Sequence, residues 1–204
     1  MSKKIVIIGG VAGGASTAAR LRRMDESLEI IMFEKGEYIS FANCGLPYYI
    51  GDVIPTREAL IVQTVEQMSR KFNLDIRNLS EVISINKEEK KISVKNYRTG
   101  EVYEESYDTL VLSPGAKPIK PPIAGIEDCK NLFTLRNIPD MDNIKSFLEE
   151  EKPKRAIVIG GGFIGLEMAE NLHEKGVNVT LVEGSNQVMG PLDIEMASII
   201  HSHL

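Results

Sequence analysis

The sequence predicts an α/β protein with two doubly wound units, an antiparallel β-meander inserted between them, and a second unit that is incomplete. Three observations carry this prediction. The order strand, glycine-rich turn, helix, strand occurs twice, in residues 3–34 and 154–183. The strands of both copies are short β-branched runs without polar alternation, as is typical of parallel strands covered on both faces. Residues 81–118 instead alternate polar and apolar side chains between turn signals, which indicates the meander.

The two repeated copies have the layout of a phosphate-binding site. Glycines let the backbone approach a pyrophosphate, and the helix that follows offers free N–H groups and a partial positive charge. Each second strand ends in a glutamate, Glu34 or Glu183, a residue that accepts hydrogen bonds from a ribose diol. In the first copy Gly9 and Gly14 hold the outer glycine positions, and Val11 holds the middle one. Two such Rossmann-like units predict two dinucleotides, usually a flavin and a nicotinamide.

The remaining elements follow in chain order. Residues 64–72 predict a short helix, and residues 109–112 a buried strand that ends the meander. A proline-rich link over 117–126 leads to a charged helix over 140–152, and residues 193–204 predict an amphipathic helix without a cap.

These elements divide the chain into a first dinucleotide-binding domain over residues 1–115, a linker with a connecting helix over 116–150, and part of a second dinucleotide-binding domain over 151–204. The last part has only two strands by Glu183 and needs more to bury its faces. We therefore expect a fragment of a longer protein.

Composition excludes several classes of function. The chain has 204 residues, of which 43% are hydrophobic and 26% charged, and its net charge of -5 gives no reason to expect nucleic-acid binding. No stretch approaches the roughly 20 apolar residues that a membrane span needs. Two cysteines are too few for a disulfide scaffold, which favours a reducing compartment. We expect a cytoplasmic protein with no metal site.

Cys44 lies in an unusual segment, "SFANCGLPYYIG". Proline is tolerated only in the first turn of a helix, so Pro47 predicts a helix that begins near Asn43 or Cys44, with Asn43 as its N-cap and Gly51 as its end. A helix N-terminus favours the thiolate, which is the nucleophile of thiol–disulfide exchange. A packed structural cysteine fits the same residues, so both interpretations stay open. For Cys129, in a polar loop, the structural interpretation is favoured.

The chain resembles the FAD-dependent pyridine nucleotide–disulfide oxidoreductases. The resemblance rests on "IGGVAGGAS", "SFANCGLPYYIG", "YDTLVLSPGAKP", "TLRN" and "GGGFIGLEMAENL", which together extend over nearly the whole chain. A single cysteine replaces the C-x4-C pair of the glutathione-reductase branch. Within the single-cysteine branch the sequence is most similar to coenzyme A disulfide reductases and NADH:polysulfide (persulfide) reductases.

The resemblance implies that residues 1–115 form an FAD-binding domain and residues 151–204 part of an NAD(P)H-binding domain, each with its own set of binding residues. Those for FAD are Gly9, Gly10, Val11, Ala12, Gly13, Gly14, Glu34, Lys35, Ser113, Pro114 and Gly115. Those for NADH or NADPH are Gly160, Gly162, Phe163, Ile164, Gly165, Glu167 and Glu183. Glu183 favours NADH, because a carboxylate repels the 2′-phosphate of NADPH.

The resemblance also implies that Cys44, beside Asn43, is the redox thiol that forms a mixed disulfide with coenzyme A. Ser16, Arg20 and Arg23 fall at i, i+4 and i+7 and share one helix face, and arginine suits phosphates. A solvated basic face is the alternative. The residues expected to receive coenzyme A are Ser16, Arg20, Arg23, Ser40, Asn43 and Lys71.

Three functions compete. The first is reduction of coenzyme A disulfide, or of a coenzyme A persulfide or polysulfide, by NAD(P)H in a full-length homodimer. The second is an NADH oxidase or peroxidase in which Cys44 cycles through a sulfenic acid. The third is a flavin-binding fragment without activity. On its own, this chain is expected to show weak turnover or none.

Overall fold

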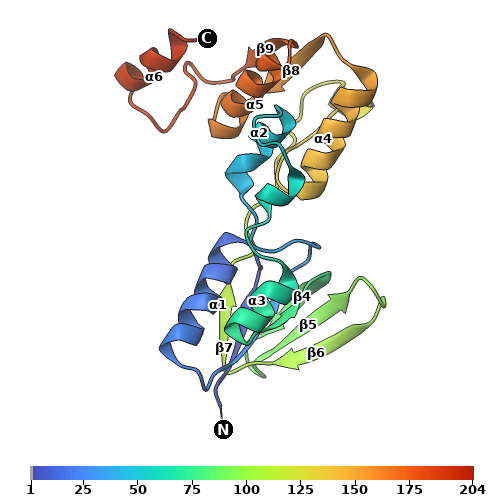
Figure 1. The fold of residues 1–204 in the computed structure, drawn as a ribbon, viewed down its shortest axis with the longest axis vertical. Coiled ribbons are helices and arrows are strands. Elements are labelled where there is room, and N and C mark those ends of the chain that lie inside the picture. Colours follow the sequence, from blue (N-terminus) through green and yellow to red (C-terminus); the bar gives the residue numbers. More distant parts are fainter. Residues whose placement is uncertain (1) are drawn as a thin grey trace. The chain divides into compact units, whose positions relative to one another are not determined.

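The computed structural model describes residues 2–204, which form two compact units (Figure 1). The first unit contains residues 2–42 and 61–116, and the second contains residues 43–60 and 117–204. The segment around Cys44 therefore packs with the C-terminal part of the chain. The expected cofactor-binding domains, residues 1–115 and 151–204, stay predictions, because a compact unit is not by itself a cofactor-binding domain.

A four-stranded parallel sheet forms the centre of the first unit, in the order β3-β2-β1-β7. Its strands are β1 (Lys4–Ile8), β2 (Glu29–Phe33), β3 (Asp75–Arg77) and β7 (Thr109–Leu112). Because all four run in the same direction, their carboxyl ends share one edge. The last strand, predicted to be buried, is only half-buried with Leu112 exposed, because β7 lies at the edge of the sheet.

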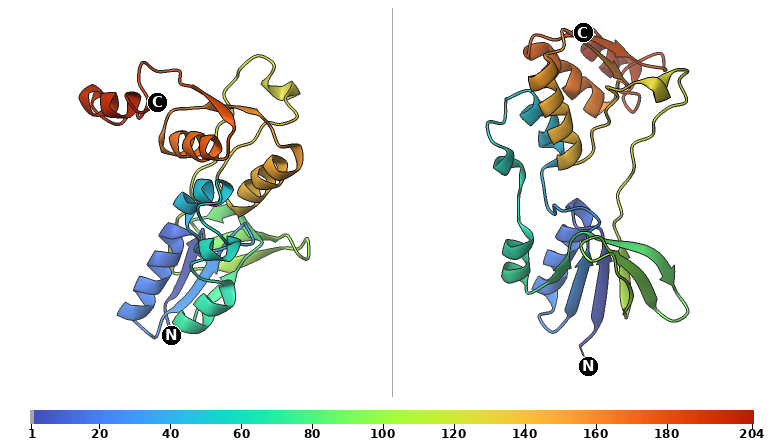
Figure 2. Two further views of the ribbon diagram at one scale, coloured as in Figure 1. Left: turned by 45° about the horizontal axis from the view of Figure 1, so that its top comes forward. Right: turned by 90° about the vertical axis from the view of Figure 1, so that its right-hand side faces the viewer.

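The two faces of this sheet have different covers (Figure 2). Helices α1 (Ala12–Met24) and α3 (Val65–Phe72) lie on one face. The antiparallel strands β4 (Ser80–Asn86), β5 (Lys91–Asn96) and β6 (Val102–Ser106) pack against the other face. The expected meander and the expected helix over 64–72 are thus confirmed.

Each cover packs on a hydrophobic core of its own. Successive side chains of β1 and β2 point to opposite faces of the sheet, so these two strands contribute residues to both cores. The core under the helices contains Ile5, Ile7, Ala15, Ala18, Ile30, Met32, Ile39, Met68 and Leu74. The core under the antiparallel sheet contains Val6, Ile31, Phe33, Ile92 and Val94.

The second unit combines two segments distant in sequence. A 3-10 turn (Asn43–Gly45), helix α2 (Leu46–Ile50) and a further 3-10 turn (Arg57–Leu60) come from the first segment. Helix α2 packs against α4 (Ile138–Glu151) and α5 (Phe163–Glu174). The helix predicted over 140–152 is confirmed as α4.

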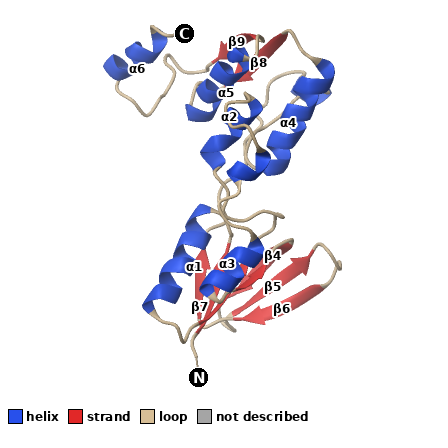
Figure 3. Ribbon diagram, in the orientation of Figure 1, coloured by secondary structure: helices blue, strands red, loops and turns tan. Residues whose placement is uncertain are grey.

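The rest of this unit is a strand pair and a terminal helix (Figure 3). Strands β8 (Arg155–Ile159) and β9 (Asn178–Val182) pair in parallel, and α6 (Ile194–His201) ends the chain. A 3-10 turn, Ile126–Asp128, begins at the end of the proline-rich link.

The strands of the second copy differ from the prediction. Burial alternates along both β8 and β9, so that Ile157 is 70% and Ile159 50% exposed. Cover on both faces is therefore missing among residues 2–204, as expected for a unit that needs more elements to bury its faces. Among residues 2–204, helix α5 packs against these strands, and one side of the pair is left uncovered.

Candidate functional site

Three groups predicted to bind one dinucleotide meet at the carboxyl edge of the first sheet. Gly9, Glu34 and Ser113 are the residues that directly follow β1, β2 and β7. The backbone N–H of Gly9 donates to the carbonyl of Phe33 (2.8 Å), and the N–H of Ser113 donates to that of Ile8 (2.7 Å). The parallel register thus brings together residues that are about a hundred positions apart in the chain.

The glycines of this edge are required by close approach of the backbone. Gly9 has φ +98°, and a Cβ there would lie 2.0 Å from the carbonyl oxygen of Ser113. A Cβ on Gly14 would lie 1.7 Å from the carbonyl oxygen of Gly9. Helix α1 starts after Val11 with no side-chain cap and no acidic residue in its first turn, so its first N–H groups are left for a ligand. The turn therefore fits a pyrophosphate.

Glu34 is hydrogen-bonded to the same turn. Its carboxylate accepts hydrogen bonds from the backbone N–H groups of Gly10 (2.7 Å) and Gly36 (2.8 Å). A carboxylate has about four acceptor positions, so it retains capacity for a ribose. The neighbouring Lys35 forms an ion pair with Glu81 (2.7 Å).

The second glycine turn repeats this geometry within the second unit. Gly160 has φ +103°, and a Cβ on Gly165 would lie 1.8 Å from the Gly160 carbonyl oxygen. Gly162 precedes α5, and a Cβ there would meet no atom within 4 Å. Phe163 and Ile164, in the first turn of α5, are exposed.

Glu183 accepts more hydrogen bonds than Glu34, its counterpart in the first unit. It accepts from the N–H of Gly161 (2.6 Å) and from both the N–H (2.8 Å) and the hydroxyl of Ser185 (2.9 Å). Hydrogen bonds from the backbone of Ser185 and Gly161 lower the pKa of Glu183 to about 2. The carboxylate is thus ionised at neutral pH. The sequence prediction missed Gly161 and Ser185, although Gly36 and Ser185 both stand two residues after a strand-ending glutamate.

Cys44 is exposed and forms no disulfide. Helical geometry does begin at Asn43, but residues 43–45 form a 3-10 turn, and the α-helix starts only at Leu46. The expectation that Asn43 caps this helix is wrong, because Gly45 is the N-cap and no side chain caps it. Gly51 ends the helix as predicted. That this position favours a thiolate stays a prediction.

The carboxylates that act on Tyr48 come from α5. The negative charge of Glu167 raises the pKa of the Tyr48 hydroxyl, with smaller contributions from burial, Glu170 and Cys44 itself. Tyr48, one helical turn after Cys44, is therefore within electrostatic reach of both glutamates. The sequence prediction included Glu167 but missed Tyr48.

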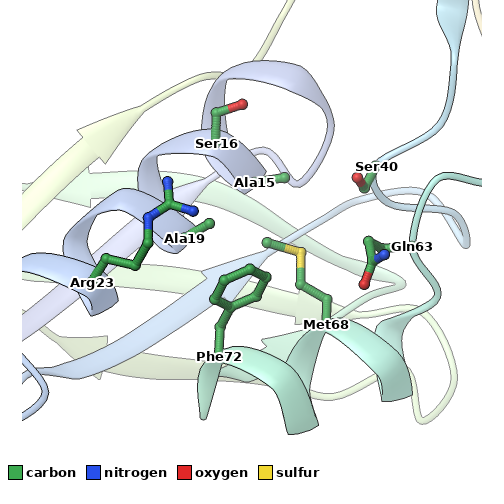
Figure 4. A pocket seen from close by; sticks show the side chains of 8 residues that line it. All are labelled: Ala15, Ser16, Ala19, Arg23, Ser40, Gln63, Met68 and Phe72. Atoms are coloured by element: carbon green, nitrogen blue, oxygen red, sulfur yellow. The ribbon is translucent and has the colours of Figure 1, made fainter.

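A pocket of about 280 Å³ opens between α1 and α3 in the first unit (Figure 4). Met68 and Phe72 on α3 face α1, and Arg23 stands at one end of the pocket. The lining residues are Ala15, Ser16, Ala19, Arg23, Ser40, Gln63, Met68 and Phe72.

The structure brings together part of the predicted coenzyme A set. Ser16, Arg23 and Ser40 line the pocket, whereas Arg20 is exposed on the same helix outside it. The Lys71 ammonium lies 5.4 Å from the ring centroid of Phe72, a lining residue. Asn43 belongs to the second unit.

Two other classes of site receive no support within residues 2–204. No group of three or more His, Cys, Asp or Glu side chains in this range could hold a metal ion. Of the helices described, none has the length and apolar character needed to cross a membrane.

Comparison with known proteins gives consistent matches. The profile of the pyridine nucleotide-disulphide oxidoreductase family matches residues 3–204. The coenzyme A disulfide reductase of Staphylococcus epidermidis is 44% identical over 193 residues, which are 95% of this chain and 43% of that protein. The crystal structure of reduced Bacillus anthracis CoADR-RHD is 67% identical, with a TM-score of 0.96 over 100% of this chain and 36% of that one. An NAD-dependent persulfide reductase from A. fulgidus is 36% identical, with a TM-score of 0.91 over 98% of this chain and 37% of that one.

Proposed function

We propose that this chain, which belongs to the pyridine nucleotide-disulphide oxidoreductase family, is part of an enzyme that reduces coenzyme A disulfide or a related persulfide. Its first glycine turn would bind FAD, its second would bind the nicotinamide cofactor, and Cys44 would be the redox cysteine. The chain spans 43% of the S. epidermidis relative, so the proposal concerns the activity of the whole protein. The observation that carries it is an exposed, unpaired cysteine in a chain with two glycine turns built for dinucleotides.

The domain roles follow from the two turns. We propose that residues 1–115 bind FAD through the first turn, Glu34 and the Ser113–Gly115 segment. Residues 151–204 bind the nicotinamide cofactor through the second turn and Glu183, with residues 116–150 connecting the two. NADH is the favoured reductant, because Glu183 is ionised and would repel a 2′-phosphate.

Bound at the first glycine turn, FAD would supply an acceptor for the hydride of NADH and a source of two electrons for cleaving a disulfide. Cys44 supplies the nucleophile. Its thiolate sulfur attacks one sulfur of coenzyme A disulfide, which breaks the S–S bond, forms a mixed disulfide and releases one coenzyme A thiolate. Two electrons then cleave the mixed disulfide, which restores the Cys44 thiolate and releases the second coenzyme A. Protons from water complete the two thiols.

The pocket between α1 and α3 is proposed to receive the phosphate-rich end of coenzyme A. Arg23 offers a planar guanidinium that matches phosphate oxygens, and Ser16 and Ser40 offer hydroxyl donors. Met68 and Phe72 give the pocket an apolar wall.

Replacement of Cys44 by serine tests the proposed function. Serine keeps the size of the side chain but is not ionised at neutral pH, so it removes the nucleophile. In the full-length protein, the Cys44→Ser variant should lose reduction of coenzyme A disulfide and keep reduction of FAD by NADH, measured by flavin absorbance. Cys129→Ser is the matched control and should leave both rates unchanged.

Normal turnover in the Cys44→Ser variant would contradict the role given to Cys44. The wild-type protein, reduced with NADH and mixed separately with coenzyme A disulfide, a polysulfide, peroxide and oxygen, identifies the acceptor. Fastest reoxidation by oxygen or peroxide would instead favour the NADH oxidase or peroxidase function.

A further inference from the structure

A charge cluster joins the loop after α2 to both helices on which α2 packs. The carboxylate of Asp52 accepts hydrogen bonds from Lys145 on α4 and from Lys175, which directly follows α5. These two contacts hold the pKa of the Asp52 carboxyl below its ordinary value. The two lysine side chains are only 14% and 21% exposed, so their ammonium groups face the loop rather than open solvent.

Lys145 also holds the last turn of α2 directly. Its ammonium donates to the carbonyl of Tyr49 (2.9 Å) and lies 4.4 Å from the centroid of the Tyr49 ring. One lysine therefore contacts α2 by a hydrogen bond, a cation–π contact and, through Asp52, an ion pair.

The backbone of Asp52 is left-handed, with φ +65°. Asparagine, aspartate and glycine tolerate this conformation better than other residues. The preceding Gly51 lies against α5, because a Cβ there would stand 2.1 Å from Oδ1 of Asn171. Asn171 is 2% exposed, and its side-chain amide donates to the carbonyl of Glu167 (2.8 Å). The end of α2 is thus seated on the same helix that carries Glu167.

Helix α2 needs such contacts. It has five residues, and an isolated helix of this length is not stable in water. Its position, and with it the position of the Cys44 turn, must come from tertiary contacts.

We propose that Asp52 is a positioning residue, which through Lys145 and Lys175 fixes the Cys44-bearing segment, residues 43–50, onto α4 and α5. The proposal rests on the proposed function in one respect, that Cys44 is the redox thiol. Without the Asp52 charge, the segment opens more often, and the thiol is correctly placed for a smaller fraction of the time. Hydride uptake from NADH does not use this segment and stays unchanged.

Two variants of Asp52 remove its charge without straining the backbone. Asp52→Asn and Asp52→Gly both accept the left-handed backbone, and both remove the carboxylate charge. The matched control is Asp142→Asn. Asp142 pairs with Arg57 through hydrogen bonds of 2.8 to 3.1 Å and is 37% exposed, and this ion pair joins residues 57–60 to α4 without involving a residue of α2 or α5.

Hydrogen–deuterium exchange in the full-length, flavin-loaded protein measures how often the segment opens, and this measurement does not depend on enzyme activity. The backbone N–H of Gly51 donates to the carbonyl of Pro47 (2.9 Å), and those of Val53 and Ile54 donate to that of Tyr48 (2.9 and 3.1 Å). Exchange of these amides should be at least tenfold faster in both Asp52 variants. It should change less than threefold in Asp142→Asn.

Turnover gives the second measurement. Both Asp52 variants should lower kcat for coenzyme A disulfide about tenfold, with KM and the rate of flavin reduction by NADH within twofold of wild type. Unchanged exchange in the Asp52 variants would overturn the proposal, and so would faster exchange with an unchanged kcat. An active Cys44→Ser variant would overturn the proposed function instead, and the exchange measurement would still decide whether Asp52 holds the segment.

Discussion

Arg22 and Arg23 are neighbours in the sequence but have different surroundings. Arg22 is 8% exposed, and its guanidinium donates to the carbonyls of Glu26, Phe72 and Asn73 at 2.6 to 2.9 Å. Arg23 is exposed and lines the pocket. Helical spacing predicts this difference, because Arg23 shares a helix face with Ser16 and Arg22 does not. One arginine therefore has a structural role, and the other is available to a ligand.

Replacing the exposed arginines tests the pocket. The double variant Arg20→Ala and Arg23→Ala should raise KM for coenzyme A disulfide at least tenfold, because one charge-assisted phosphate contact, that of Arg23 in the pocket, already contributes about 1.5–3 kcal/mol. Its kcat should change less than threefold. The matched control is Arg70→Ala, an exposed arginine on α3 that does not line the pocket. KM is measured by steady-state kinetics. An unchanged KM in the double variant would show that these arginines form a solvated face that does not bind coenzyme A disulfide.

Side chains that act through local spacing were predictable, and those that act through tertiary contact were not. The strand-ending position predicted Glu34 and Glu183 as acceptors at the glycine turns. The pocket wall of Met68 and Phe72 was missed, because nothing local relates α3 to α1. Tyr48 was missed for the same reason, since its environment depends on α5.

At the scale of elements, Pro47 correctly predicted where helical geometry begins. The sequence did not reveal that the first turn is 3-10 and that α2 has only five residues. This difference matters for the position of Cys44, because an isolated helix of five residues is not stable in water. The position of the Cys44 segment therefore depends on α4 and α5.

The second glycine turn gives a prediction that separates folding from binding. A Cβ on Gly165 would stand 1.8 Å from a carbonyl oxygen, so Gly165→Ala forces α5 away from β8 and should cost about 1–3 kcal/mol or more of stability. A Cβ on Gly162 meets open space, so Gly162→Ala should change the melting temperature by only about 3 °C. It should nevertheless weaken NADH binding at least tenfold, because the methyl group blocks approach of a pyrophosphate.

Thermal melting and NADH titration of both variants provide the measurement. Equal losses of stability in the two variants would show that Gly162 is needed for the fold. Unchanged NADH affinity in a well-folded Gly162→Ala variant would place the pyrophosphate elsewhere.

At the scale of the whole molecule, the order of the chain does not match its division into units. Residues 43–60 follow the first glycine turn in sequence but pack with residues 117–204. The close fit of Gly51 against Asn171 is one cause, and the ion pairs of Asp52 are another. Neither is visible in the sequence, because each joins residues more than ninety positions apart.

The division into units predicts how the molecule unfolds. Each unit has buried apolar residues of its own, so we expect two thermal transitions by calorimetry. A ligand that binds only a folded unit stabilises it by about 2.7 kcal/mol at a concentration of 100 times Kd, which raises a melting temperature by roughly 10 °C. Added to flavin-free protein, FAD should raise the transition of the first unit, and NADH that of the second. Gly165→Ala should lower only the transition that NADH raises. A single transition that both ligands shift equally would show that the two units unfold as one.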